Sequence, residues 1–218
     1  PTLMPDAGLG RDLALRHALE TDNFDMYCGH TCSLVAIDIE AAAHAFFQLF
    51  SSPALRQQMG AAGRQRAREV FDWGNIIPRY ENLWAELATI RQEKAPTLAP
   101  LKHAWPARMD PFHTFSSFPT RQLSSQTRLA LVDPDLETTE RRILDLRHLD
   151  MVNFARYVQP TPEEIRLILN AAASGPATAG RLVQGIPAHR RSFALRSLVW
   201  LVKLGVLRHL PSLPSSRT

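Results

Sequence analysis

Apolar residues recur at helical spacing in the stretch that follows residue 38. One predicted helical face consists of Ile39, Ala43, Phe46, Phe47 and Phe50. The residues just before it, 34–39, form a short run rich in β-branched side chains, which predicts a buried strand. Asp38 stands where a helix N-cap is expected. The pattern therefore predicts a strand that runs directly into a helix.

Two further helices are predicted before residue 95. Ser52 occupies an N-cap position, and Pro53 occupies the first helical position, where a missing N–H has no effect. The apolar face of the next helix consists of Ile76, Tyr80, Leu83, Trp84 and Leu87. Pro78 fits this helix with Asn75 as its cap, because the proline then lies in the first turn.

The second half of the chain also has a helical pattern. Predicted helices lie within residues 137–158, 161–175, 177–187 and 188–205. Thr161 and Glu164 are spaced as a capping box, and Gly205 stands at the C′ position of the last helix. Residues 206–210 predict a short strand that follows this helix.

A proline-rich stretch separates these two regions. Five prolines between Lys94 and Thr120 exclude a long helix and predict a linker. We expect a first segment 1–94, a Pro-rich linker 95–120, a small helical domain 121–210 and a disordered tail 211–218. The expected fold class is mainly α with minor β.

Composition narrows the class of protein. The chain has 218 residues and is 45% apolar, which predicts a hydrophobic core. No apolar run approaches the roughly 20 residues of a membrane-spanning helix, and the first residues lack the features of a signal peptide. Two cysteines exclude a disulfide framework. We therefore predict a cytoplasmic protein with no transmembrane segment.

Charge is distributed unevenly along the chain. Residues 1–100 have 9 Lys/Arg against 12 Asp/Glu, a balance of −3, and residues 101–218 have 16 against 9, a balance of +7. The basic second region predicts an anionic partner, which would be nucleic acid, an acidic lipid surface or an acidic protein face. A basic face in contact with solvent is the alternative.

Tyr27 to Cys32, with the sequence YCGHTC, contains both cysteines and a histidine. A structural zinc site would need a fourth ligand, and the chain has no second close pair of Cys or His. The Cys-x-x-x-Cys spacing also differs from the Cys-x-x-Cys of redox sites. We predict no metal site here and expect small buried thiols.

Residues 1–87 contain motifs that resemble a known family. The segment 51–73, SSPALRQQMGAAGRQRAREVFDW, combines a short helix, a Met-Gly turn, an Arg-rich helix and a Phe-x-Trp. Residues 76–87, IIPRYENLWAEL, match the family's terminal helix. This stretch resembles the C-terminal end of a group 1 (family 4) glycosyltransferase, a GT-B type fold with two Rossmann-like domains.

The resemblance implies transfer of a sugar from a nucleotide-sugar donor to an acceptor, without a metal. The family's paired-glutamate donor motif, its basic residues for the diphosphate and its Gly-rich loop would lie upstream of Pro1. We therefore assign no catalytic residue and no cofactor to this chain. We expect it to be an inactive distal portion whose partner is a missing N-terminal Rossmann-like half.

Three residues of the first segment are candidates for substrate binding. Arg64 and Arg68 share a helix face and would meet the diphosphate of a donor, whereas a solvated helical face is the alternative. The resemblance to the glycosyltransferases implies that YCGHTC is an insertion between two Rossmann-like elements. His30 would then reach the interdomain cleft and contact the acceptor.

Residues 195–208 resemble the last helix and following strand of a winged-helix domain. In such a domain Arg190, Arg191 and Arg196 would meet phosphates or base edges in the major groove. The bulky side chains of Phe193 and Trp200 favour packing against another surface instead. A winged-helix-type nucleic-acid or protein-binding module is therefore the alternative function, with protein docking favoured over DNA binding.

Overall fold

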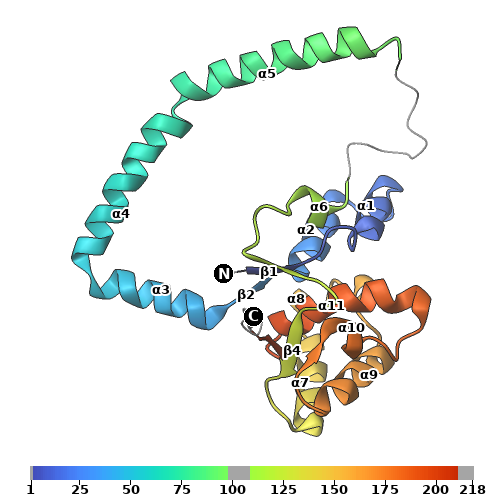
Figure 1. The fold of residues 1–218 in the computed structure, drawn as a ribbon. Helices are drawn as coiled ribbons and strands as arrows, with labels where there is room; N and C mark the ends of the chain where they lie inside the picture. Colours follow the sequence, from blue (N-terminus) through green and yellow to red (C-terminus); the bar gives the residue numbers. More distant parts are fainter. Residues whose placement is uncertain (1, 98–108, 211–218) are drawn as a thin grey trace, which may run out of the picture. The chain divides into compact units, whose positions relative to one another are not determined.

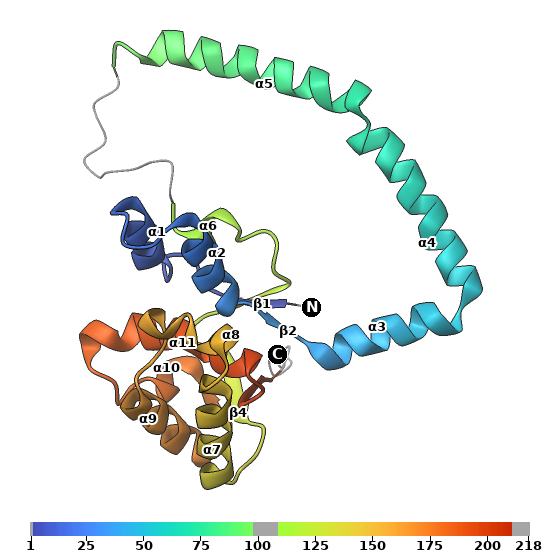
Figure 2. The same ribbon diagram turned by 180° about the vertical axis from the view of Figure 1, so that it is seen from behind.

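The computed structural model describes residues 2–97 and 109–210, which are mainly helical with two small sheets (Figures 1 and 2). This confirms the predicted fold class of mainly α with minor β. Contacts divide the chain into two compact units, residues 1–39 with 105–218 and residues 40–104. The units do not coincide with the predicted boundaries at residues 94 and 121, because residues 2–39 pack with the second half of the chain.

A three-stranded sheet joins the start of the chain to its second half. Its order is β2-β1-β3, formed by β1 (Thr2–Pro5), β2 (Ala36–Ile37) and β3 (Arg121–Leu123). β1 is antiparallel to β2 and parallel to β3, and Met4 stands opposite Gln122. The predicted strand at 34–39 is only two residues long, because helices occupy the chain up to Ser33 and from Ile39 onward.

Three helices belong to the same region. They are α1 (Arg11–Ala18), α2 (Phe24–Ser33) and α6 (Pro111–Thr114). Asp110 caps α6 by accepting hydrogen bonds from the first backbone amides, and Phe112 is fully buried. A Cβ atom on Gly10 would lie 2.7 Å from the Phe112 ring, so the close approach of α6 requires glycine at this position.

The second sheet holds the rest of this unit together. Its order is β5-β4-β6 with both pairs antiparallel, formed by β4 (Arg128–Leu131), β5 (Ala177–Thr178) and β6 (Leu207–His209). The surrounding helices are α7 (Leu136–Arg147), α8 (Asp150–Asn153), η2 (Arg156–Val158), α9 (Pro162–Ala173), α10 (Ala179–Leu182), η3 (Ala188–Arg190) and α11 (Arg191–Lys203). Figure 1 shows these helices around β4.

The sequence predicts most of these helices, with one correction. The predicted helix 137–158 is broken after Arg147, and the chain turns so that Ala155 and Val158 both enter the core. The capping box of Thr161 and Glu164 is confirmed. Gly205 adopts a φ of 68°, the left-handed conformation that ends a helix.

One hydrophobic cluster spans this unit. Its most deeply buried members come from both ends of the sequence and include Leu13, Leu34, Phe112, Leu123, Ile168 and Leu198. Burying these side chains together stabilises the association of residues 2–39 with residues 109–210. Within the described ranges, no helix is both long enough and apolar enough to cross a membrane.

The second unit consists of helices that follow one another in a series. They are α3 (Ile39–Ser51), α4 (Pro53–Arg66), a π-helical turn η1 (Ala67–Phe71) and α5 (Trp73–Lys94), and Figures 1 and 2 show them end to end. None of these four elements contains a buried residue. We call α3 to α5 the arm.

The N-cap residue of α4 is the one predicted from the sequence, whereas that of α5 is a different residue. Ser52 caps α4 by accepting a hydrogen bond from the Leu55 amide, and Pro53 is its first residue, as predicted. The cap of α5 is Asp72 and not Asn75, because the Asp72 carboxylate accepts from the Gly74 amide. Pro78 consequently lies inside the helix, close to its first turn.

Candidate functional site

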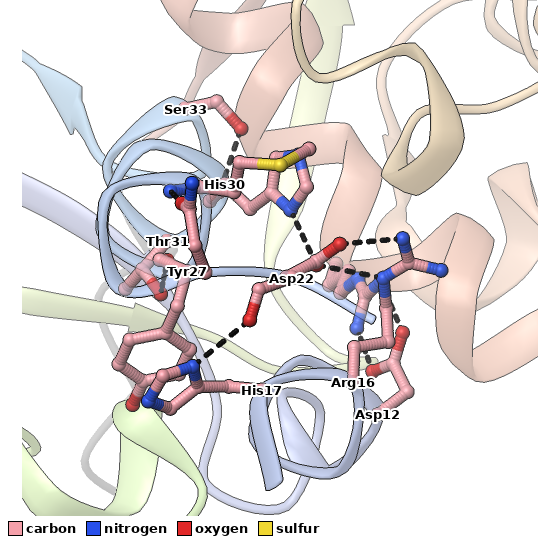
Figure 3. Close-up of polar contacts among 11 residues, drawn as sticks. Asp12, Arg16, His17, Asp22, Tyr27, His30, Thr31 and Ser33 are labelled. Carbon is pink, nitrogen blue, oxygen red and sulfur yellow. Dashed lines mark hydrogen bonds and ion pairs between the residues drawn. The ribbon is translucent and has the colours of Figure 1, made fainter. Parts of the chain in front are cut away.

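Asp22 is the centre of a buried polar cluster between α1 and α2 (Figure 3). Its Oδ1 accepts from Arg16 Nη2 at 2.7 Å, and its Oδ2 accepts from Arg16 Nε at 2.8 Å. The same Oδ2 lies 3.0 Å from Nδ1 of His30. Hydrogen bonds from Arg16 hold the pKa of Asp22 below its usual value, so the carboxylate is ionised.

A tight turn brings Asp22 to this position. Glu20 has a φ of 57°, and the amides of Thr21 and Asp22 both donate to the carbonyl of Arg16. Asn23 then accepts from the Met26 amide and caps α2. The reversal of the chain places Asp22 between the last turn of α1 and the face of α2.

His30 is completely buried in α2. Its Nδ1 faces the Asp22 carboxylate and donates to it, which leaves Nε2 as a lone pair with no partner within the described residues. Its ring stacks on Phe154 with centroids 6.0 Å apart, and a Cβ atom on Gly29 would lie 2.7 Å from the Phe154 ring. Burial lowers the pKa of His30, which favours the neutral ring.

An aspartate and a histidine in this arrangement form a general-base pair in many enzymes. Here the imidazole has no exposed surface, so a substrate has no access to Nε2 in this arrangement. The expected contact of His30 with a sugar acceptor in an open cleft does not fit this burial. The pair instead fixes α2 against Phe154 of the second half.

Arg196 connects α11 to the start of the chain. Its Nη1 donates to the Leu9 carbonyl at 2.9 Å and to Asp12, and its Nη2 donates to Asp12 Oδ2 at 2.7 Å. Only 1% of Arg196 is exposed. This arginine therefore cannot contact a phosphate backbone while residues 2–39 are in place, contrary to its predicted role in nucleic-acid binding.

The other two predicted arginines also have partners in the chain. Arg190 makes two hydrogen bonds to Glu164, at 2.8 and 2.9 Å, and lowers the pKa of that carboxyl. Arg191 Nε donates to the Ile186 carbonyl at 2.9 Å. The structure places both residues at the start of α11 and leaves part of each exposed.

Charge complementarity supports the contact between the two halves of this unit. Residues 1–39 have 2 Arg and 6 Asp/Glu, a balance of −4, and residues 109–210 have 13 Lys/Arg and 9 Asp/Glu, a balance of +4. The Asp12–Arg196 pair lies at their contact, and Lys203 Nζ also donates to the Cys32 carbonyl at 2.7 Å. The basic second region thus has an acidic partner inside the chain, and an external anionic partner stays a prediction.

Arg64 and Arg68 lie together in the arm. They line a shallow groove on α4 and η1 with Ala61, Gln65 and Glu69. Both arginines are exposed, and Gln65 donates to Glu69 at 2.8 Å. Every lining residue comes from one continuous helical stretch, so the groove is an open face and does not enclose a ligand.

The cysteines differ from the expected buried thiols. Cys28 is half-buried and Cys32 is exposed, and both are free. The stretch is helical, so Cys28 and Cys32 lie one turn apart on a face that differs from that of His30. Among the residues that the structure describes, no group of three His, Cys, Asp or Glu side chains is placed to hold a metal ion.

The sequence-based search missed Asp12, Asp22 and Phe154. Asp12 and Arg196 are separated by 184 positions, and no local spacing relates them. The single available indication was the opposite charge balance of residues 1–39 and the basic second region.

No family model, no curated protein and no solved structure matches this chain. The resemblance to glycosyltransferases therefore depends on the residues quoted above, and it stays a prediction.

Proposed function

We propose that residues 1–94 are the distal portion of a glycosyltransferase that moves a sugar from a nucleotide-sugar donor to an acceptor. In this proposal an N-terminal Rossmann-like half provides the donor site, and this chain alone does not transfer sugar. The supporting observation is that the arm contains no buried residue, although it has large apolar side chains along its length.

The exposed aromatic side chains of α3 are the clearest part of this observation. Phe46, Phe47 and Phe50 are 70%, 69% and 88% exposed. An amphipathic helix in a soluble protein normally turns such a face toward a sheet or another helix. In the proposal the apolar face of α3 packs against the sheet of a Rossmann-like domain.

The arm matches the family pattern only in part. The expected turn at Met59 and Gly60 is absent, because both residues lie inside the continuous helix α4. The Arg-rich stretch continues to Arg68, and Phe71 and Trp73 flank the cap of α5. Stabilising a leaving nucleoside diphosphate requires cationic groups or a helix N-terminus aimed at the phosphates. Arg64 and Arg68 are the candidates for this role in the complete enzyme.

A transfer assay tests this proposal. The chain is incubated with radiolabelled UDP-, GDP- and ADP-sugars and a panel of acceptors, alone and together with the region encoded upstream of Pro1. We expect no turnover from the chain alone and turnover from the combined protein. Turnover by the chain alone, or an upstream region without paired glutamates, would refute the proposal.

A matched pair of variants tests the role of α3 in the combined protein. Phe47→Glu places a charge on the apolar face, whereas Gln48→Glu places one at an exposed position on the opposite face of the same helix. We expect the first variant to abolish transfer and the second to retain it. Equal activity in the two variants would contradict the proposed packing of α3.

A winged-helix-type docking module is the second candidate function, for residues 121–210. The order α9, β5, α10, α11, β6 with a central antiparallel strand β4 supports it. The burial of Arg196 favours protein docking over DNA binding. Titration with random duplex DNA at several salt concentrations tests this, and we expect no binding; tight binding with a steep salt dependence would favour the nucleic-acid alternative.

A further inference from the structure

The apolar face of α5 has the seven-residue pattern of a helix that pairs with another helix. With Trp73 at position a of the heptad, the a and d positions are Trp73, Ile76, Tyr80, Leu83, Leu87, Ile90 and Lys94. Six of these seven are apolar, and none of them is buried in the structure. Tyr80, Leu83 and Leu87 are 50%, 45% and 51% exposed.

The charges beside this face indicate which helix it pairs with. Glu86 occupies a g position and Arg91 the e position five residues later. Residues five apart are not neighbours on their own helix, and neither side chain has an ion-pair partner among the described residues. In two parallel helices in register, each g position faces the following e position of the other helix. Glu86 would therefore face the partner's Arg91, and the reverse pair would form by symmetry.

The exposed rings of α5 contribute to the pairing surface. Trp73, Tyr80 and Trp84 are 72%, 50% and 62% exposed. At roughly 200 Å² for each fully exposed ring, these three rings offer on the order of 400 Å². Each partner buries about 800 Å² in a standard interface, so the aliphatic side chains of the seam and the charged pairs beside it must supply the remainder. Residues 39–94 have 7 Lys/Arg and 6 Asp/Glu, so net charge does not oppose self-association.

We propose that two copies of this chain pair through α5 as a parallel, in-register coiled coil. Tyr80, Leu83 and Leu87 form its seam, and two symmetric pairs of Glu86 with the partner's Arg91 set its register. This dimer goes beyond the proposed function, because it uses α5 and does not require sugar transfer. A glycosyltransferase assay and a mass measurement therefore fail independently of each other.

Sedimentation equilibrium of the full chain tests the dimer. We expect a mass of twice 24.5 kDa at micromolar concentration. Leu83→Glu combined with Leu87→Glu should give a monomer, and it should remain folded because neither side chain is buried in the chain itself. A monomeric wild-type chain, or a dimeric double variant, would overturn the proposal.

A charge exchange tests the parallel register. Glu86→Arg replaces two attractive pairs by two repulsive ones and should weaken the dimer about tenfold. Adding Arg91→Glu should restore the wild-type affinity. Glu81→Arg is the matched control, since position 81 lies at b, away from the seam, and should leave the affinity unchanged. Failure of the second substitution to restore the affinity would contradict the register.

Other occupants of the face give different results in the same experiments. A monomer that binds anionic vesicles would identify a lipid surface, and a monomer that binds the separately expressed upstream region would identify the Rossmann-like half. Either result would overturn the proposed pairing of two copies.

Discussion

At the scale of single residues, two polar pairs support the contact between residues 2–39 and residues 109–210. Asp12 pairs with Arg196 across this contact, and Asp22 pairs with His30, whose ring stacks on Phe154. Arg196, Asp22 and His30 are buried, whereas the Asp12 side chain is 47% exposed. Removing the partner of a buried polar group leaves that group without its hydrogen bond, so substitutions in these pairs should lower stability.

Arg196→Ala should lower the free energy of unfolding of the unit formed by residues 2–39 and 109–210 by about 2–3 kcal/mol. The substitution removes the two charge-assisted hydrogen bonds to Asp12 and the packed apolar part of the arginine side chain. Arg181→Ala is the control, since Arg181 is exposed, and should change stability by less than about 0.5 kcal/mol. Urea denaturation measures both values. Similar free energies of unfolding for the two variants would show that the Asp12 pair contributes little.

Stability should fall as pH drops below 6.5, the ordinary pKa of histidine, because burial lowers the pKa of His30 in the folded chain. The unfolded chain then binds more protons than the folded one, so the stabilisation is complete above 6.5 and is lost below it. Arg16 and Arg196 add to the lowering of this pKa, whereas the Asp22 carboxylate opposes it. Asp22 itself, with a lowered pKa, contributes only in a separate and more acidic window.

His30→Gln tests this pH dependence, because the amide can still donate to Asp22 but does not titrate. Burial also lowers the pKa of His209, so the His30→Gln variant and the reference protein with which it is compared should both contain His209→Gln. Denaturation at a series of pH values between 7 and 5 should give a flatter profile for the His30 variant. An unchanged slope would mean that His30 is not the titrating group.

At the scale of elements, the position of α2 depends on its close approach to Phe154. Gly29 allows this approach, because any side chain there would meet the Phe154 ring. Gly60 in α4 has no atom within 4 Å of an added Cβ. The same change from glycine to alanine should therefore have opposite effects in the two helices.

Gly29→Ala should destabilise the protein despite the higher helix propensity of alanine, which is worth about 1 kcal/mol. Gly60→Ala should increase the helix content of the arm for the same propensity reason. Thermal melting followed by circular dichroism measures both. The combination of Gly29→Ala with Phe154→Leu should recover stability, and a lack of recovery would argue against the ring contact.

Local sequence patterns predicted the elements well where a cap or an amphipathic face defines them. The capping box at Thr161, the cap at Ser52 and the C′ glycine at 205 are examples. The break after Arg147 was not predicted, because it depends on which residues enter the core. The burial of His30 and Arg196 was not predicted either, because each packs against residues that are far away in the sequence.

At the scale of the whole molecule, residues 2–39 and 109–210 form one unit although the arm separates them in sequence. The parallel pairing of β1 with β3 and the Asp12–Arg196 pair are among the contacts that join these two segments into one unit. This organisation could not be predicted, because a boundary drawn at the proline-rich stretch assumes that sequential segments fold separately.

Cleavage within the arm should leave the discontinuous unit intact. A protease site inserted next to Gly60 gives two fragments that should co-elute in size-exclusion chromatography after cutting. Arg196→Ala should weaken their association, whereas Arg181→Ala should not. Separation of the wild-type fragments would show that the contacts across the unit are too weak to hold it together without the covalent connection.

The parallel pairing of β1 with β3 delays the folding of residues 2–39 while the chain is being synthesised. Thr2 cannot hydrogen-bond to Thr120 until Thr120 has been synthesised. Asp12 cannot pair with Arg196 until that residue, 184 positions later, has been synthesised. At a translation rate of about 5–20 residues per second, this delay lasts roughly 10–40 s. During that interval the segment 2–39 exposes Leu3, Leu13 and Leu34 without their final neighbours, so ribosome-associated chaperones are expected to bind this segment until α11 has left the exit tunnel.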